Sequence, residues 1–295
     1  MRTLLLAALL FLGRPDCRAA EGAAFLNIGA GARALGLGGA YTALADDANA
    51  LHWNAAGLAA LEKREFTAGH AELFESTRLD SLTYAQPTSR GTFSGGVTYL
   101  SQARIEGRDA LGRPAPGYNA SDAALSLGYG RALEFARVGV GVKYIRSHIG
   151  SSEAQGVALD LGAQRRFERL SLGAALRNLG AGLKFADRRD DLPLRLALGA
   201  AYTSEGGHSA AVELINGPRG AGTQAALGGE YQAVSHLYLR AGYATQTAAG
   251  GSGFDAARGL AMGLGFRGAT WSLDYAVLAS GELGRAHRFS LGGRW

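Results

Sequence analysis

Cysteine, proline and long apolar runs are scarce in this chain. Its 295 residues include one cysteine, Cys17, and only six prolines. A single cysteine excludes a disulfide framework and any zinc site built from several cysteines. Beyond residue 13 there is no run of about 18 apolar residues, which excludes a bundle of membrane-spanning helices. Disorder is excluded as well, because 47% of the residues are hydrophobic.

Patterns that bind nucleic acid, hold a metal or carry catalysis are also missing. The net charge is +5, yet lysine and arginine form no continuous run, so we expect no nucleic-acid partner. The six histidines show neither H-x-x-H nor H-E-x-x-H spacing, and no G-x-S-x-G motif occurs. The sequence therefore predicts no metal site, no cofactor and no enzyme activity.

The first 19 residues predict a secretory signal peptide. Met1 and Arg2 give a positively charged start, and residues 4–12 form a short apolar stretch. Small residues at Cys17 and Ala19 precede the expected cleavage after Ala19. The alternative interpretation is a buried N-terminal helix. Cleavage would export the mature chain and leave it without cysteine.

Glycine is the residue that is present in excess. The chain has 45 glycines, about twice the usual ~7% share. Many of them alternate with apolar residues: Val138, Val140 and Val142 are separated by Gly139 and Gly141. Such a period of two is typical of a strand with two different faces.

About fourteen segments of this kind follow one another. They lie near residues 65–75, 79–87, 91–103, 121–134, 136–148, 154–167, 170–178, 193–204, 208–216, 222–232, 236–246, 258–267, 270–278 and 286–295. Short connections alternate with longer ones, and the longer ones are 104–120, 179–192, 247–257 and 279–285. Short periplasmic turns and longer external loops are typical of outer-membrane barrels. The sequence thus predicts an all-β fold, a transmembrane antiparallel β-barrel of about 14 strands over residues 63–295, in the bacterial outer membrane and in contact with its lipid and lipopolysaccharide. A soluble β-sandwich or β-helix is the alternative.

Charged residues share one face of the strands with most of the strand glycines. We expect this face to line the lumen. The candidate lumen residues are Lys143, Asp160, Arg177, Arg195, Arg240, Arg267 and Asp274. They either pair across strands and stiffen the wall, or form a polar route or a site for an anionic head group. The other face carries leucine, valine, alanine and aromatic residues, as a lipid-facing surface requires.

The last segment ends the chain in Trp295. A final strand with a terminal aromatic residue resembles the signal that the barrel-insertion machinery reads. We therefore expect that machinery to be a partner during assembly.

Residues 20–62 do not alternate and form a separate segment, rich in glycine and alanine. Its motif residues are Arg33, Gly36, Gly38, Gly39, Asp46, Asp47, Asn49, Trp53, Asn54 and Gly57. Residues 31–58 resemble the start of the PorV/PorQ family and are similar, more distantly, to the FadL family of outer-membrane fatty-acid channels. In both families a motif A-x-A-x-x-x-N-P-A-G-L lies in an N-terminal hatch inside a fourteen-stranded barrel. Here Ala55 replaces the usual proline.

The resemblance implies two possible functions. The first is a channel for hydrophobic or amphipathic small molecules that enter at the external mouth. Candidate mouth residues are Leu183, Lys184, Phe185, Arg188 and Arg189, although the basic ones could equally face lipopolysaccharide. The alternative is a component of the type IX secretion system that binds secreted cargo domains. In either case we expect the hatch residues mainly to hold the plug in place.

Overall fold

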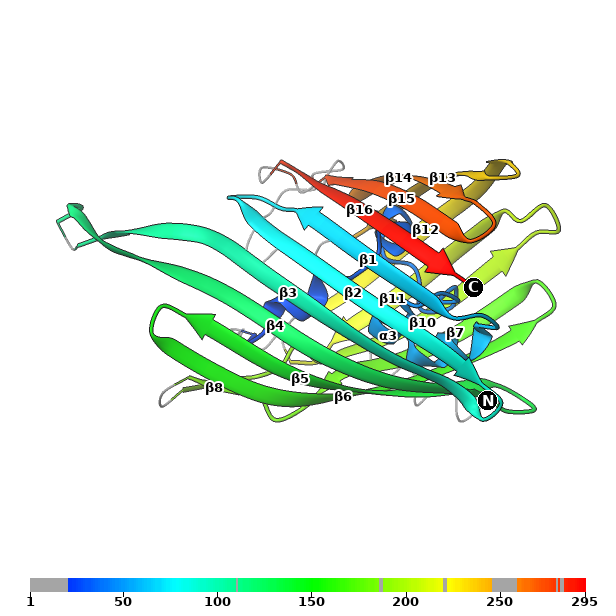
Figure 1. Ribbon diagram of the computed structural model, residues 1–295, viewed down its shortest axis with the longest axis horizontal. Coiled ribbons are helices and arrows are strands. Elements are labelled where there is room, and N and C mark those ends of the chain that lie inside the picture. Colours follow the sequence, from blue (N-terminus) through cyan, green and yellow to red (C-terminus); the bar gives the residue numbers. More distant parts are fainter. Residues whose placement is uncertain are drawn as a thin grey trace.

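The computed structural model describes residues 21–109, 111–185, 188–219, 222–245, 259–279, 281 and 284–295. In these residues fourteen strands pair antiparallel and close into a barrel, which confirms the predicted barrel and its strand number (Figure 1). The predicted signal peptide, residues 1–19, lies outside the described residues. The barrel strands are β1 (Glu65–Glu72), β2 (Thr77–Thr88), β3 (Gly91–Arg108), β4 (Pro114–Ala132), β5 (Arg137–Ile149), β6 (Ser152–Phe167), β7 (Leu170–Leu179), β10 (Arg195–Thr203), β11 (Ser209–Gly217), β12 (Gly222–Val234), β13 (Leu237–Ala244), β14 (Leu260–Arg267), β15 (Trp271–Ala279) and β16 (Arg285–Arg294).

The two ends of the barrel differ in their connections. At one end, which we call the turn end, the connections are the short ones: 89–90, 133–136, 168–169, 204–208, 235–236 and 268–270. Both ends of the barrel chain, Glu65 and Arg294, also lie there and pair with each other. The opposite end, the loop end, carries the β7–β10 connection. This connection contains a small hairpin of β8 (Leu183–Phe185) and β9 (Arg188–Asp190).

One expected loop is instead part of the sheet. Most of residues 104–120 continue β3 and β4, which pair as far as Arg108 and Pro114 and extend beyond the other strands (Figure 1). The Asp109 carboxylate accepts the backbone N–H groups of Leu111 and Arg113, both at 2.9 Å, and so fixes the tip. The sequence did not reveal this extension because the hairpin lacks the apolar alternation that marks the other strands.

The outer surface of the barrel is an apolar band. Its exposed side chains include Leu82, Val97, Leu125, Leu127, Val142, Val157, Val212, Leu227, Leu264, Leu273 and Leu291. Aromatic pairs gather at the turn end, where Phe93 lies 4.9 Å from Tyr129 and Phe266 lies 5.1 Å from Trp271, between ring centroids. A band of this kind bordered by aromatic residues is typical of lipid-facing barrels.

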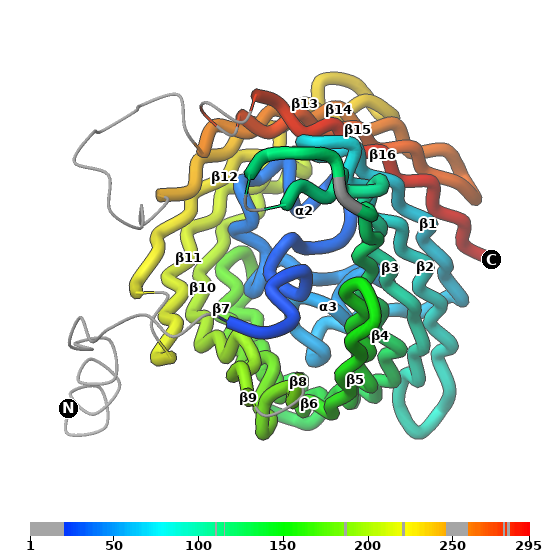
Figure 2. The backbone as a smooth tube through the Cα atoms, turned by 90° about the vertical axis from the view of Figure 1, so that its left-hand side faces the viewer, coloured from blue at the N-terminus to red at the C-terminus, as the bar shows by residue number. Residues whose placement is uncertain are grey.

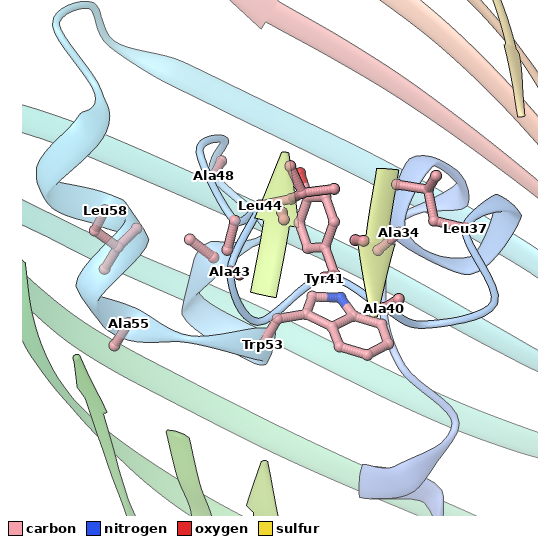
Figure 3. Packing of buried hydrophobic residues seen from close by; sticks show 14 of the residues in the cluster. Ala34, Leu37, Ala40, Tyr41, Ala43, Leu44, Ala48, Trp53, Ala55 and Leu58 are labelled. Atoms are coloured by element: carbon pink, nitrogen blue, oxygen red, sulfur yellow. The ribbon is translucent and has the colours of Figure 1, made fainter. Parts of the chain in front are cut away.

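The hatch, residues 21–61, fills the lumen (Figure 2). It contains η1 (Ala24–Asn27), α2 (Ala32–Gly36), α3 (Ala50–Trp53) and η2 (Ala55–Ala60). None of the helices in the described ranges is long and apolar enough to cross a membrane. Tyr41 and Trp53 lie edge to face near the middle of the hatch core, with ring centroids 6.1 Å apart, and Leu37 and Leu58 belong to the same core on either side of them (Figure 3).

Inward glycines explain how the hatch fits. A Cβ atom at Gly130 would lie 2.8 Å from the backbone nitrogen of Ala59, and one at Gly173 would lie 2.8 Å from the Cα of Ala43. A wall residue with any side chain would therefore collide with the hatch backbone. The same holds for Gly139, Gly162, Gly228 and Gly242. These inward glycines thus bring two backbones into contact.

Candidate functional site

A cavity of about 410 Å³ lies between the hatch and the loop-end half of the barrel. We call it the chamber. Phe25, Leu26 and Ile28 from the start of the hatch border it on one side, and Ile215 and Leu278 of the wall border it on others. Its volume falls within the range of about 300–1,000 Å³ that is usual for small-molecule pockets.

One wall of the chamber is charged. Lys143 of β5 and Asp160 of β6 form a buried ion pair with 2.6 Å between Nζ and Oδ2. The Lys143 ammonium also donates to the Asn178 side chain at 2.7 Å, and the Asn178 backbone N–H donates to Asp160 at 2.8 Å. The lysine charge is therefore compensated within the wall.

Two arginines face each other on the same side of the barrel. Arg177 of β7 is the register partner of Arg195 of β10. Arg195 binds the Glu21 carboxylate through two hydrogen bonds of 2.8 Å, which ties the start of the hatch to the wall. The Arg177 guanidinium lies over the Trp53 ring, 5.4 Å from its centroid, and its Nε is buried without a hydrogen-bond partner. Arg177 is therefore the least compensated cation of the chamber.

A second charged network joins the hatch to the other side of the barrel. Arg33 of α2 donates to both carboxylate oxygens of Glu230 at 3.1 and 3.2 Å, to the Tyr41 hydroxyl at 2.9 Å, and to Asp46. Glu230 also accepts from Arg240 Nε at 2.6 Å. Burial alone would lower the pKa of Arg33, but Asp46 and Glu230 raise it well above its ordinary value, so the network keeps its positive charge.

Arg240 extends this network along the wall from Glu230 of β12 to Asp274 of β15. Its Nη1 donates to Asp274 at 2.7 Å, and Arg267 approaches Glu230 to 3.9 Å. The predicted lumen residues thus form two separate groups. Lys143, Asp160, Arg177 and Arg195 border or support the chamber, whereas Arg240, Arg267 and Asp274 lie beside α2.

The other motif residues hold the hatch together. Asp47 accepts the Tyr41 hydroxyl at 2.7 Å and the Asn49 backbone N–H at 3.0 Å. Asn54 caps η2 through Ala56 and donates to the backbone carbonyls of Thr42 and Ala163. Within the hatch, a Cβ at Gly57 would overlap the Ala45 carbonyl, Gly39 lies beside Trp53, and Trp53 donates to the Ala30 carbonyl. Two further glycines touch the wall: Gly36 touches Gly263, and Gly38 touches Tyr243.

Glu213 of the wall and His52 of the hatch also join the two parts of the molecule. Glu213 accepts the backbone N–H groups of Tyr41 and Thr42 at 2.8 and 2.7 Å. His52 borders the chamber and contacts the Thr83 hydroxyl of β2 at 2.9 Å. Burial and the nearby Lys143 charge lower the pKa of His52 to about 4, so this ring is neutral at pH 7. No spacing in the sequence connects Glu213 to Tyr41 and Thr42, or His52 to Thr83, because these contacts arise only when the barrel closes around the hatch.

The predicted mouth residues lie apart from the chamber. Leu183 is fully buried against Gly156 of β6, whereas Lys184, Arg188 and Arg189 are exposed on the β8–β9 hairpin, and Phe185 is half-buried. The five are not among the described residues that border the chamber. Within the described ranges no group of histidine, cysteine, aspartate and glutamate has an arrangement that could hold a metal ion.

Comparisons place the fold among known barrels. A family model described as "Uncharacterised protein family (UPF0164)" matches residues 16–180. The toluene transporter TodX of Pseudomonas putida is 13% identical, with a TM-score of 0.66, and the match covers 94% of this chain and 98% of that one. The toluene transporter TbuX of Ralstonia pickettii is 13% identical with a TM-score of 0.65, covering 90% and 98%. A Pseudomonas aeruginosa FadL homologue is 13% identical with a TM-score of 0.59, covering 90% and 97%. Curated proteins give no match. At these identities the likeness shows a shared fold.

Proposed function

The chain belongs to the UPF0164 family, and from the geometry of its barrel we propose that it is an outer-membrane channel for hydrophobic or amphipathic small molecules. The chamber carries this proposal. It combines apolar side chains such as Leu26 and Ile215 with a charged wall, and the hatch lies between it and the turn end. Such a lining suits a ligand that is mostly apolar with at most one polar group.

Two observations support transport across the outer membrane. The outer apolar band, with aromatic residues at the turn end, is like the lipid-facing surface of barrels that span a membrane. The titles of two structures with the same fold, TodX and TbuX, name toluene transporters. We therefore propose lipid and lipopolysaccharide as surroundings, the barrel-insertion machinery as the reader of the strand that ends in Trp295, and no enzyme activity.

The resemblance to PorV/PorQ and the type IX secretion role that it implies stay predictions. No contact in the described residues favours cargo binding over transport. The experiment below separates the two, because a cargo-docking barrel would not lose its function when the chamber is filled.

The test fills the chamber. We expect Ile215→Trp, which adds bulk on an inward position of β11, to abolish uptake of labelled toluene and palmitate by proteoliposomes containing the full chain. The matched control is Leu214→Trp on the adjacent, outward position, where the side chain is 48% exposed, and it should transport like the unmodified protein. Unchanged uptake by a folded Ile215→Trp barrel would refute the proposal.

A further inference from the structure

The chamber is the first of three neighbouring cavities, and the second and third lie along the inner face of β1 and β16. The second, of about 10 Å³, shares Gly29, Ala30 and Leu35 with the chamber. The third, of about 150 Å³, lies at the turn end between the hatch and the wall, and Arg33 and Asp47 border it. The three cavities thus lead from the chamber past the hatch.

Consecutive wall positions connect the second cavity to the third. On β16 the inward residues Arg288 and Ser290 border the second cavity, and the next inward residue, Gly292, borders the third. On β1, Gly69 borders the second and Thr67 the third. Because inward residues follow one another about 7 Å apart along a strand, the cavities are stacked. We call this wall, together with hatch residues 29–33, the seam.

The hatch does not pack against the seam glycines. A Cβ atom at Gly69 would have Ser81, Ser290 and Phe289 as its nearest neighbours, all of them wall residues. For Gly292 the nearest neighbours are Ser272 and Phe66, again of the wall. At Gly130, Gly139 and Gly173, in contrast, the hatch backbone occupies this volume, whereas Gly69 and Gly292 border cavities between hatch and wall.

Few polar contacts cross the seam. In the described part of the chain two hydrogen bonds join the hatch to β1 or β16. Ala32 N–H donates to the Ser290 hydroxyl at 2.8 Å, and Ala48 N–H donates to Glu65 at 3.1 Å. Residues 29–33 are therefore joined to β1 and β16 by one hydrogen bond, that of Ala32, while Arg33 holds the segment to Glu230 of β12.

Arg288 is an unpaired cation at the narrowest part of the seam. Its side chain is buried, its Nε has no hydrogen-bond partner, and no carboxylate of the described residues lies within 4.0 Å of it. Arg177 at the chamber also has no carboxylate within 4.0 Å among the described residues, whereas the buried Lys143 and Arg240 have carboxylate partners. A buried unpaired cation favours an anion beside it.

We propose that the chamber connects to the turn end along the seam, and that Arg288 makes this passage selective for anions. The passage opens when Ala32 separates from Ser290. It takes small inorganic anions and the anionic head group of an amphipathic substrate. This inference rests on the proposed function, since it gives the substrate of the chamber an exit. Residues of one charge at a constriction set the selectivity of a pore in the same way.

The test measures ion current through the full chain in planar bilayers under a potassium chloride gradient. Cys17 is the single cysteine, so a Cys17→Ser background permits cysteine labelling. We expect Ser290→Cys to lose its current when a methanethiosulfonate reagent is added. The matched control is Ser94→Cys, a buried inward position of β3 that borders none of the three cavities, and its current should not change.

A second measurement tests Arg288. In the unmodified protein the reversal potential should indicate a preference for chloride, and Arg288→Gln should lose that preference. Ser290→Ala removes the hydrogen bond without adding bulk and should increase the open time, which keeps the test valid if the cysteine variant does not fold. A current that survives confirmed labelling of Ser290→Cys, or an unchanged reversal potential in Arg288→Gln, overturns the inference. Loss of toluene and palmitate uptake with a normal seam current would instead refute only the proposed function.

Discussion

The hatch meets the barrel wall in two different ways. Along β4–β7 and β10–β13 its backbone touches inward glycines such as Gly139 and Gly242, and charged groups tie it to the wall. Along β1 and β16 the inward glycines Gly69 and Gly292 lie next to wall serines and border cavities, and Ala32 and Ala48 donate the hydrogen bonds that join hatch and wall. The same residue type therefore anchors the hatch on one side and leaves a gap on the other.

This difference shows that a glycine in a barrel wall has no fixed structural role. What matters is whether an opposing backbone occupies the volume of the missing side chain. At anchored positions such as Gly139 and Gly242 a substitution must displace main chain, whereas at Gly69 and Gly292 of the seam it displaces a serine side chain.

The largest effect is expected for Glu230→Gln on the anchored side. Glu230 is buried and compensates Arg33 and Arg240, which would be left without their shared carboxylate. Breaking a buried ion pair from one side costs about 3–5 kcal/mol. We expect the urea concentration at the midpoint of unfolding to fall accordingly. Unfolding is measured by the heat-dependent mobility of the barrel in electrophoresis.

The control for this loss is Asp80→Asn. Asp80 pairs with His70 at 2.7 Å, but both side chains are about half exposed. Exposed pairs contribute about 0–1 kcal/mol, so unfolding should shift little. Equal effects of the two substitutions would show that the anchored network does not hold the hatch.

A smaller effect is expected for Gly139→Ala. The new Cβ would overlap the backbone of Ala55 and Ala56, which cannot move without shifting η2. Overpacking of this kind costs about 1–3 kcal/mol. The matched substitution is Gly69→Ala on the seam, where the nearest atom is the Ser81 hydroxyl at 2.6 Å. Because a hydroxyl rotates away, we expect the unfolding midpoint of Gly69→Ala to change less than that of Gly139→Ala, and a reversed order would contradict the comparison.

The barrel could be predicted because its pattern is local. Alternation along each strand, as at Val138–Val142, reports which face meets lipid, and short turns at every second connection report the topology. The same alternation identified the inward charges such as Lys143 and Arg240. Both are buried in the structure.

The partners of those charges could not be predicted, because they come from distant parts of the chain. Arg33 meets Glu230 across 197 positions, and Arg195 meets Glu21 across 174. For the mouth residues, the fold of a short local segment could not be predicted either. Leu183 was expected to contact a ligand, but the hairpin places it in the wall packing against β6. A loop's composition does not reveal which way the loop folds.

The smallest expected effect concerns pH and the contact of the hatch with β2. His52 touches Thr83 there, and burial together with the Lys143 charge lowers the pKa of His52 from 6.5 to about 4. The unfolded chain therefore binds a proton between these values while the folded chain does not, so stability falls as the pH drops from about 6.5 toward 4. Linkage limits this loss to about 2 kcal/mol between pH 7 and pH 5.

The substitution that isolates this effect is His52→Gln, which keeps a donor for Thr83 and removes the titrating ring. The carboxylates near the hatch titrate in both proteins, so the difference between the two stability profiles reports His52 alone. We expect urea midpoints that converge as the pH falls from 7 to 5, because only the unmodified protein must release the His52 proton on folding. Parallel profiles would mean that the His52 ring is hydrated from the chamber. In that case the contact with β2 would be as open to solvent as the seam beside it.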